Sequence, residues 1–271
     1  MIDLIFEAFQ FAFMIRAFVV GMLIAISAAT LGTFLVLKRF SMIGHGLAHV
    51  AFGAVAIGLL TQQQPLLVAL PIVVLVSVAI LKLNETANVH ADAAIGLAAT
   101  FAMAFGTILA SVGGGFRVEL NTYLFGSILT VQSLDVILAA VFTLVLVLGV
   151  VLYYHDLFAL TYDENYARVS GVKTQRLNTA LAIFSGILVV LGIRLVGTVL
   201  ISSFIIFPAV IAMQFGRGFK GTLIIAVLTS LVTVFLGLLG SYVYDTPSGS
   251  TIVVLNGVVF MFAYVYHKFT I

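Results

Sequence analysis

Two histidines, His45 and His49, lie one helical turn apart in the apolar segment SMIGHGLAHVAFGAVAIG at residues 41–58. The i, i+4 spacing places both imidazoles on the same face of a helix. Neutral imidazoles ligate divalent transition metals, and two such pairs facing each other across a dimer axis would supply the four nitrogens of a tetrahedral zinc site. A histidine pair that only bonds neighbouring helices is the alternative, and the residue types leave both interpretations open.

Several other chemistries are excluded. The metalloprotease motif HExxH needs a glutamate directly after its first histidine, whereas this segment reads HGLAH, with Gly46 at that position. The chain has no cysteine, which excludes a thiolate metal site and a cysteine nucleophile. It also lacks the GxxxxGK(S/T) loop that holds nucleotide phosphates. We therefore predict no catalytic residue, no permanently bound cofactor and no enzymatic activity in this chain.

The composition places these histidines in a membrane. Of the 271 residues, 63% are hydrophobic and only 8% are charged, and the mean hydropathy is +1.27. A soluble domain carries about 25% charged residues. The apolar runs are continuous rather than alternating, which favours helices over membrane strands. We predict an all-α, polytopic helical bundle that forms a single transmembrane domain over residues 1–271 and contacts lipid but no nucleic acid.

Nine apolar runs are candidates for membrane spans. A helix needs about 20 residues to cross the hydrocarbon core of a bilayer. Only Arg194 separates the sixth run from the seventh, so eight spans and a broken helix are the alternative. The runs cover about residues 14–37, 41–61, 65–81, 91–111, 133–153, 177–193, 195–215, 221–243 and 250–267.

The basic residues predict an orientation, with the N-terminus outside and the C-terminus inside, because loops on the cytoplasmic side are enriched in Lys and Arg. In this orientation the inner loops carry Lys38, Arg39, Lys82, Arg168, Lys173, Arg176, Arg217, Lys220 and Lys268. The outer side then carries only Arg16, Arg117 and Arg194.

The spans contain no means of driving transport by themselves. A carrier driven by protons or sodium normally holds a carboxylate in the middle of the membrane. No Asp or Glu lies at that depth in the predicted spans, and the nucleotide loop is missing as well. A pump with these properties must take its energy from another polypeptide. A passive channel needs no such energy and remains the alternative.

The inner segment 155–178, HDLFALTYDENYARVSGVKTQRLN, is the longest polar stretch of the chain. Thr161 or Asp163 can cap a short helix there, with Glu164 in its first turn and Gly171 at its end. Such a helix at the inner surface could receive force from a soluble partner. A solvated connector is the simpler interpretation.

Two further features lie elsewhere. The outer connection 112–132 is half polar and half apolar, which predicts a short interfacial or re-entrant helix. Pro208 falls inside the seventh run and removes one backbone hydrogen bond, so it should kink the helix. We interpret that helix as lining the pathway, with a packing kink as the alternative.

Four motifs together resemble a known family: LGTFLVLKRFSMIGHGLAHVAFGAVAIG at 31–58, LNTYLFGSIL at 120–129, TYDENYARVSGVKTQRLN at 161–178 and VGTVLISSFIIFPAVIAMQF at 196–215. The chain is similar to the permease subunits of zinc, manganese and iron ABC importers, the ZnuB-like or ABC-3 group. The resemblance covers nearly the whole length.

This resemblance implies a multi-pass protein of a prokaryotic cell membrane that imports a divalent transition metal. It implies three partners: a second copy of the chain, a cytoplasmic ATP-binding subunit and an extracellular metal-binding protein. The segment matching 161–178 is the coupling helix in that family. Asp163, Glu164, Tyr166, Arg168 and Gly171 are therefore expected to belong to the dock for the ATPase.

One departure from the family affects the metal. The family usually has GDxxxH where this chain has Gly44-His45 and His49. Imidazole in place of carboxylate moves the ligand set from oxygen toward nitrogen, which disfavours manganese relative to zinc. We expect His45 and His49 to contact the transported ion, with zinc as the first choice and manganese or iron as the alternatives. The same substitution is also compatible with a pair that gates the pathway without binding.

Overall fold

The computed structural model describes residues 10–86, 90–113, 126, 131–197, 201–216 and 218–270. These residues form helices joined by short connections, with no strand among them, as predicted for an all-α bundle. The helices are α2 (Ala12–Leu37), α3 (Ile43–Leu60), α4 (Pro65–Thr86), α5 (Ala91–Val112), α7 (Ser133–Leu152), α8 (Tyr154–Tyr162), α9 (Glu164–Val169), α10 (Thr174–Val196), α11 (Ile201–Met213), α12 (Gly218–Tyr244) and α13 (Ser248–Thr270).

Eight of these helices are long and apolar enough to cross a membrane: α2, α3, α4, α5, α7, α10, α12 and α13. The seventh apolar run forms only α11, which has 13 residues. At 1.5 Å per residue this helix is about 20 Å long, shorter than the hydrocarbon core. The arrangement is therefore the alternative with eight spans and a broken helix. The break does not fall at Arg194, which lies within α10. It falls at Gly197, where φ is +85°, because glycine adopts a positive φ without strain.

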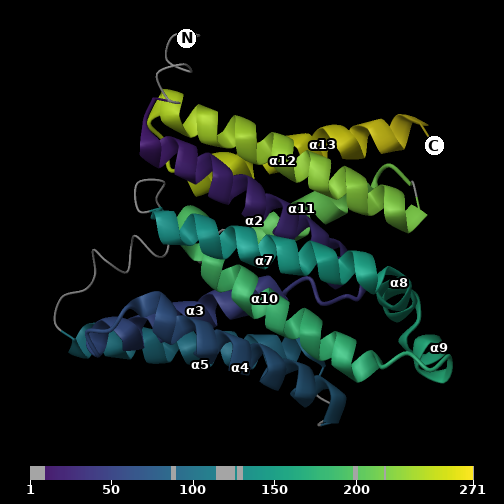
Figure 1. The fold of residues 1–271 in the computed structure, drawn as a ribbon, viewed down its shortest axis with the longest axis horizontal. Coiled ribbons are helices and arrows are strands. Elements are labelled where there is room, and N and C mark those ends of the chain that lie inside the picture. The colour runs from purple at the N-terminus through teal and green to yellow at the C-terminus, as the bar shows by residue number, and fades with distance from the viewer. Residues whose placement is uncertain are drawn as a thin grey trace.

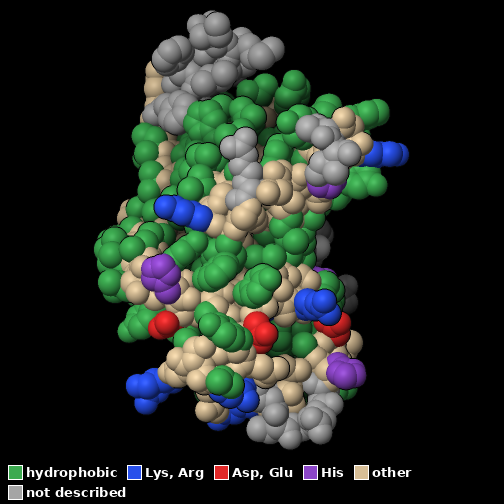
Figure 2. Space-filling model, turned by 90° about the vertical axis from the view of Figure 1, so that its right-hand side faces the viewer, with side chains coloured by type: hydrophobic (Ala, Val, Ile, Leu, Met, Phe, Trp, Pro, Cys, Tyr) green, Lys and Arg blue, Asp and Glu red, His purple; other side chains and the backbone are tan. Residues whose placement is uncertain are grey.

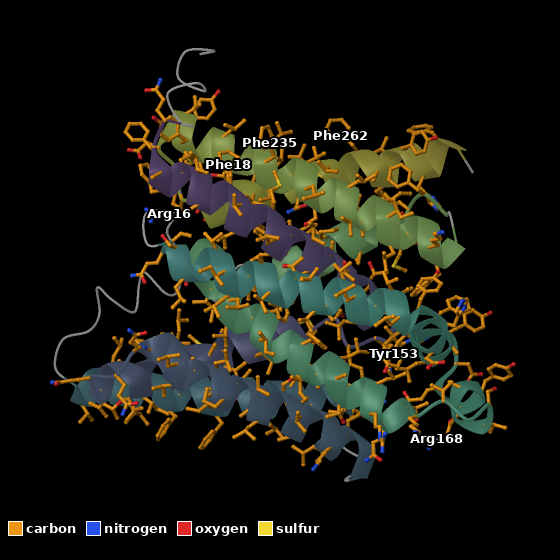
Figure 3. The ribbon with its side chains drawn as sticks, viewed as in Figure 1. Arg16, Phe18, Tyr153, Arg168, Phe235 and Phe262 are labelled. Carbon is orange, nitrogen blue, oxygen red and sulfur yellow. The ribbon has the colours of Figure 1, made fainter. Side chains whose placement is uncertain are left out.

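The long helices lie side by side in the bundle (Figure 1). Helix α2 begins at one end and α13 finishes at the other, where α8 and α9 also lie. Arg16 and Arg168 mark these opposite ends in Figure 3. Seen from the α8–α9 end, basic and acidic side chains stand among hydrophobic ones (Figure 2). Arg16 and Arg168, which the sequence assigns to opposite sides of the membrane, thus lie at opposite ends of the bundle, and the assignment of the α8–α9 end to the cytoplasm stays a prediction.

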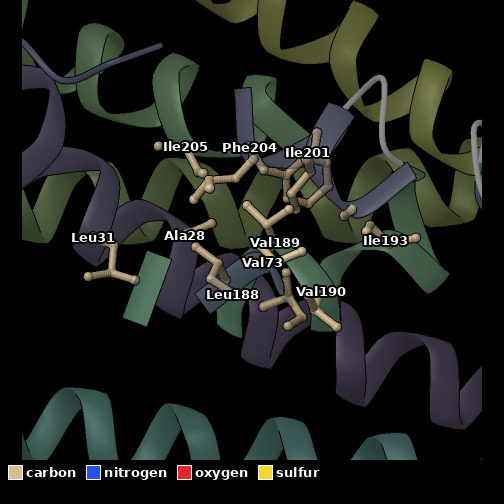
Figure 4. Close-up of a cluster of buried hydrophobic side chains, with 14 of the residues drawn as sticks. Ala28, Leu31, Val73, Leu188, Val189, Val190, Ile193, Ile201, Phe204 and Ile205 are labelled. Atoms are coloured by element: carbon tan, nitrogen blue, oxygen red, sulfur yellow. The ribbon is translucent and has the colours of Figure 1, made fainter. Parts of the chain in front are cut away.

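Helix α2 runs through the centre of the bundle and packs against α7, α10, α11 and α12. Its side chains Ala28 and Leu31 are fully buried. They lie in a cluster with apolar residues from α4, α10 and α11 (Figure 4). Hydroxyl groups add ties between helices: Ser27 and Thr143 Oγ atoms are 2.9 Å apart between α2 and α7. Such bonds contribute about 0.6 kcal/mol each in membrane proteins.

Glycines allow the closest helix contacts, as expected in a membrane where packing rather than hydrophobicity holds helices together. A Cβ atom on Gly53 of α3 would lie 2.6 Å from the carbonyl oxygen of Ala102 on α5. A Cβ on Gly44 would lie 2.6 Å from the Ile205 side chain of α11. The glycine-rich sequence of α3 therefore fixes this helix between α5 and α11.

The outer connection predicted at 112–132 falls largely outside the described residues. Helix α5 ends at Val112 and α7 begins at Ser133. The start of α7 is stabilised by a capping box, in which the backbone amide of Gln132 donates to Asp135 Oδ2 at 2.7 Å. Gln132 is thus the N-cap residue of α7, and Asp135 is the third helical residue of the capping box.

Candidate functional site

The two histidines of α3 contact each other directly. The Nε2 atoms of His45 and His49 are 3.2 Å apart, and the rings meet nearly perpendicularly with centroids 4.6 Å apart. Both side chains are half-buried, whereas most of the surrounding helix is buried. The pair is therefore one local group on an accessible stripe of a tightly packed helix, as the i, i+4 spacing predicts.

Neighbouring glycines define the direction of this stripe. Gly44 contacts α11, and Gly46, two residues further, contacts Ile95 of α5. Successive residues turn by about 100° around a helix. His45 therefore points between the contact with α11 and the contact with α5, and His49 follows on the same side. The sequence predicted the shared face, but only the packing of α3 shows which two helices flank it.

The distance between the two Nε2 atoms is compatible with two states. One neutral imidazole can donate a hydrogen bond to the other at 3.2 Å. Two nitrogens that ligate the same tetrahedral zinc ion, each at about 2.05 Å, are themselves about 3.3 Å apart. The nitrogen separation is therefore nearly the same in the two states, although each ring must turn to direct its lone pair at a common ion. The pair alone offers two ligands, and the described residues contain no cluster of three or more His, Cys, Asp or Glu side chains.

Pro208 lies inside α11, as predicted, and its side chain is buried. Helix α11 contacts both α2 and α3. It is thus the short helix next to the histidine stripe. Its position is consistent with a helix beside the pathway, and the role of the proline stays a prediction.

The inner polar segment folds into the short helices α8 and α9. Asp163 caps α9, because its Oδ1 accepts hydrogen bonds from the backbone amides of Asn165 and Tyr166 at 2.9 and 3.0 Å. At the other end, Gly171 has φ +86° and its amide donates to the Arg168 carbonyl. The amide of Val172 donates to the carbonyl of Ala167, which completes a Schellman motif. The predicted start and stop signals of this helix are therefore confirmed.

Glu164 faces the bundle and not the surrounding space. Its Oε2 lies 3.2 Å from Lys38 Nζ at the end of α2, and its Oε1 accepts from Asn178 Nδ2 of α10 at 2.9 Å. Lys38 also donates to Asn178 Oδ1. We call Lys38, Glu164 and Asn178 the inner clasp. It joins α9 to α2 and α10, and the chain from Lys38 enters α3 only five residues later.

The outward surface of α8 and α9 carries large side chains. Tyr162, Tyr166 and Val169 are 85%, 67% and 89% exposed. The Arg168 side chain is exposed too, and one of its guanidinium nitrogens, Nη2, lies 3.5 Å from Glu164 Oε1. Of the residues predicted for the dock, Tyr166 and Arg168 thus face outward, whereas Asp163, Glu164 and Gly171 shape or anchor the helix.

Sequence reasoning missed Lys38 and Asn178 as partners of this segment. Lys38 counted only as an inner-loop charge, and Asn178 only as the last residue of a polar stretch. In the sequence, Lys38 lies 126 positions before Glu164 and 140 positions before Asn178. The only available signal was a lysine placed at the very end of an apolar run.

The eight long apolar helices define a multi-pass membrane protein, with a histidine pair on α3 and the short capped helix α9 at one end of the bundle. Residues 10–267 match the family model of the ABC 3 transport family, and the chain belongs to that family of metal ABC transporter permeases. Its helices and its bacterial relatives make it a multi-pass protein of the cell membrane.

Individual relatives agree with this assignment. The chain is 32% identical to a Thermotoga maritima protein named "Probable metal transport system membrane protein", over 93% of this chain and 89% of that one. It is 25% identical to the high-affinity zinc uptake system membrane protein ZnuB of Haemophilus influenzae, over 93% and 97%. Other relatives are named for manganese and for iron transport. The solved structure of PsaBC from Streptococcus pneumoniae in complex with Fab has the same fold, with a TM-score of 0.86, 24% identity and coverage of 97% and 95%.

Proposed function

We propose that this chain is the permease subunit of an ATP-driven importer of divalent transition metal ions, with zinc as the principal substrate and manganese as the second. The observation that carries the proposal is the half-buried His45–His49 pair, with its nitrogens 3.2 Å apart on a membrane helix. Titratable groups within membrane-spanning helices are costly and are usually functional.

The donor set favours zinc. Imidazole nitrogen suits zinc, whereas manganese prefers oxygen ligands. One pair supplies two nitrogens, so two copies of the chain facing each other would complete a tetrahedral set. The contact must also be weak, because an ion held tightly would not leave the pathway. The direct contact between the two histidines is lost when an ion binds. This loss lowers the net affinity of the pair for the ion.

The helix α9 is proposed as the coupling helix for a cytoplasmic ATP-binding subunit. Tyr162 of α8 and the outward residues Tyr166 and Val169 of α9 give an exposed apolar surface of the kind that protein partners cover. The inner clasp connects this surface to α2 and α10. On the outer side, an extracellular metal-binding protein would deliver the ion.

Zinc uptake by cells or proteoliposomes that contain the assembled transporter tests the histidine pair. We expect His49→Ala to reduce the rate of zinc uptake severely while the complex still assembles. His90→Ala is the matched control, because His90 is an exposed histidine that makes no side-chain cap at the start of α5. Uptake at the normal rate by an assembled His49→Ala transporter would exclude the pair from the mechanism.

A second measurement separates the importer from a stand-alone channel or carrier. The purified chain alone is placed in liposomes that contain a metal-sensitive dye. We expect no sustained flux until the ATP-binding subunit and ATP are supplied. Flux without them would support the channel, and no flux under any condition would support a scaffolding role.

A further inference from the structure

A large groove opens on the side of the bundle between α7, α8 and α10. Its volume is about 740 Å³. Val145 and Gly149 of α7 and Phe184 of α10 line its apolar part. Tyr153, which Figure 3 labels where α7 meets α8, lies at the opposite part of the groove. The groove does not include the histidine pair, so it is a separate feature.

The polarity of the groove changes along its length. Lys173 and Arg176 line the end nearest α9, and both side chains are exposed. Phe184 lies 11 residues beyond Lys173 on the same helix, which is about 16 Å at 1.5 Å per residue. Half the hydrocarbon thickness of a bilayer is about 15 Å. The groove therefore runs from a charged rim to an apolar interior over the length of one leaflet.

The charge at the rim favours an anion. Lys173 and Arg176 are at the N-terminus of α10, where the helix dipole is also positive, and no acidic residue lies in the first turn of α10. Asp156 of α8 is the one acidic side chain among the residues lining the groove. The rim thus has two cations and one carboxylate, in a position where a negative group of a ligand would be stabilised.

Gly149 leaves open space along the α7 wall of the groove. A Cβ atom built on this residue meets nothing within 4 Å. A larger side chain at this position would therefore extend into the groove and not into a neighbouring helix.

We propose that the groove binds one anionic phospholipid of the inner leaflet, with its phosphate at Lys173 and Arg176 and an acyl chain along Val145, Gly149 and Phe184. Basic pockets between membrane helices on the cytoplasmic side are a known way of holding anionic headgroups. Because Ser170, Gly171 and Val172 also line the groove, the bound lipid would lie beside the end of α9.

Native mass spectrometry of the delipidated full-length chain tests this site. The chain is titrated with phosphatidylglycerol and with phosphatidylcholine of identical acyl chains. We expect the first phosphatidylglycerol to bind roughly tenfold more tightly, since each cation near the headgroup contributes about 1 kcal/mol and Asp156 offsets part of this. The Lys173→Gln/Arg176→Gln variant should lose this preference, whereas Lys220→Gln, an exposed cation of α12 outside the groove, should keep it.

A second pair of variants tests the apolar part of the groove. Gly149→Phe should fill the groove and weaken the binding of both lipids. Gly257→Phe is the matched control on α13, because a Cβ there also meets nothing within 4 Å. Equal affinity for the two lipids, or unchanged phosphatidylglycerol binding by Gly149→Phe, would overturn the proposal. So would a Gly149→Phe variant that loses dimer mass but keeps its lipid, which would assign the groove to a second copy.

Discussion

The inner clasp gives the sharpest test of how the inner helix is connected to the membrane helices. Lys38→Met removes the cation, Glu164→Gln removes the anion, and the double variant removes both. Each change keeps a side chain of similar length, so the packing around α9 is disturbed as little as possible. The three variants and the original chain form a double-mutant cycle that isolates the contact between the two residues.

The expected coupling energy follows from the contacts. The Lys38–Glu164 pair is 3.2 Å apart, with the two side chains 11% and 34% exposed. A hydrogen bond between charged groups contributes about 1.5–3 kcal/mol when buried, and an exposed ion pair contributes about 0–1 kcal/mol. Because a third of Glu164 is exposed and water screens the pair, we expect a coupling energy of about 1–2 kcal/mol, close to a tenfold change in the folding equilibrium.

The assay measures the free energy of unfolding of each variant in the same detergent or nanodisc. A second readout on the assembled transporter is the number of ions imported per ATP hydrolysed. We expect Lys38→Met and Glu164→Gln each to lower the free energy of unfolding and the number of ions imported per ATP. The loss in the double variant should be smaller than the sum of the two single losses. As a control, Arg168→Gln should change stability by less than about 0.5 kcal/mol, because its contact with Glu164 is an exposed i, i+4 pair.

The result that refutes this reasoning is specific. If the two single effects add within about 0.3 kcal/mol, the two residues do not interact in the folded protein. If the cycle shows coupling in stability but ions imported per ATP stay normal in every variant, the clasp holds the fold and does not transmit motion. Only coupling in both readouts supports a connection from α9 through Lys38 to α2.

Three further predictions concern backbone and helix contacts. Gly171→Ala should destabilise α9 by about 1–2 kcal/mol, because φ is +86° there, and Gly171→Asn should be tolerated better; thermal unfolding of the two variants compares them. Gly53→Ala should cost about 1–3 kcal/mol by forcing α3 away from α5, whereas Gly96→Ala, with open space around its Cβ, should be neutral or stabilising; equal melting temperatures would contradict this. Thr143→Val removes the bonds of Thr143 Oγ1 to Ser27 Oγ and to the Leu23 carbonyl and should cost about 1.2 kcal/mol, and no change in unfolding free energy would show that the two bonds contribute nothing.

The sequence alone determined the features that depend on neighbouring residues. Run lengths placed the eight long helices, because crossing a bilayer requires about 20 apolar residues. Local hydrogen-bonding chemistry set the limits of α9 at Asp163 and Gly171. Helical periodicity also placed His45 and His49 on one face, where they are found in contact.

Only the tertiary structure decided which distant residues meet. Glu164 was expected to face a partner protein, but it bonds Lys38 and Asn178, and a capping pattern contains no information on the direction of a side chain relative to other helices. Helix α11 is short because the chain turns at Gly197, where φ is positive, and a hydropathy pattern contains no information on backbone dihedral angles. The flanks of the histidine stripe and the groove between α7 and α10 arise from how the helices pack. Lipid-facing and helix-facing surfaces are equally apolar in a membrane protein, so hydrophobic pattern cannot tell one from the other.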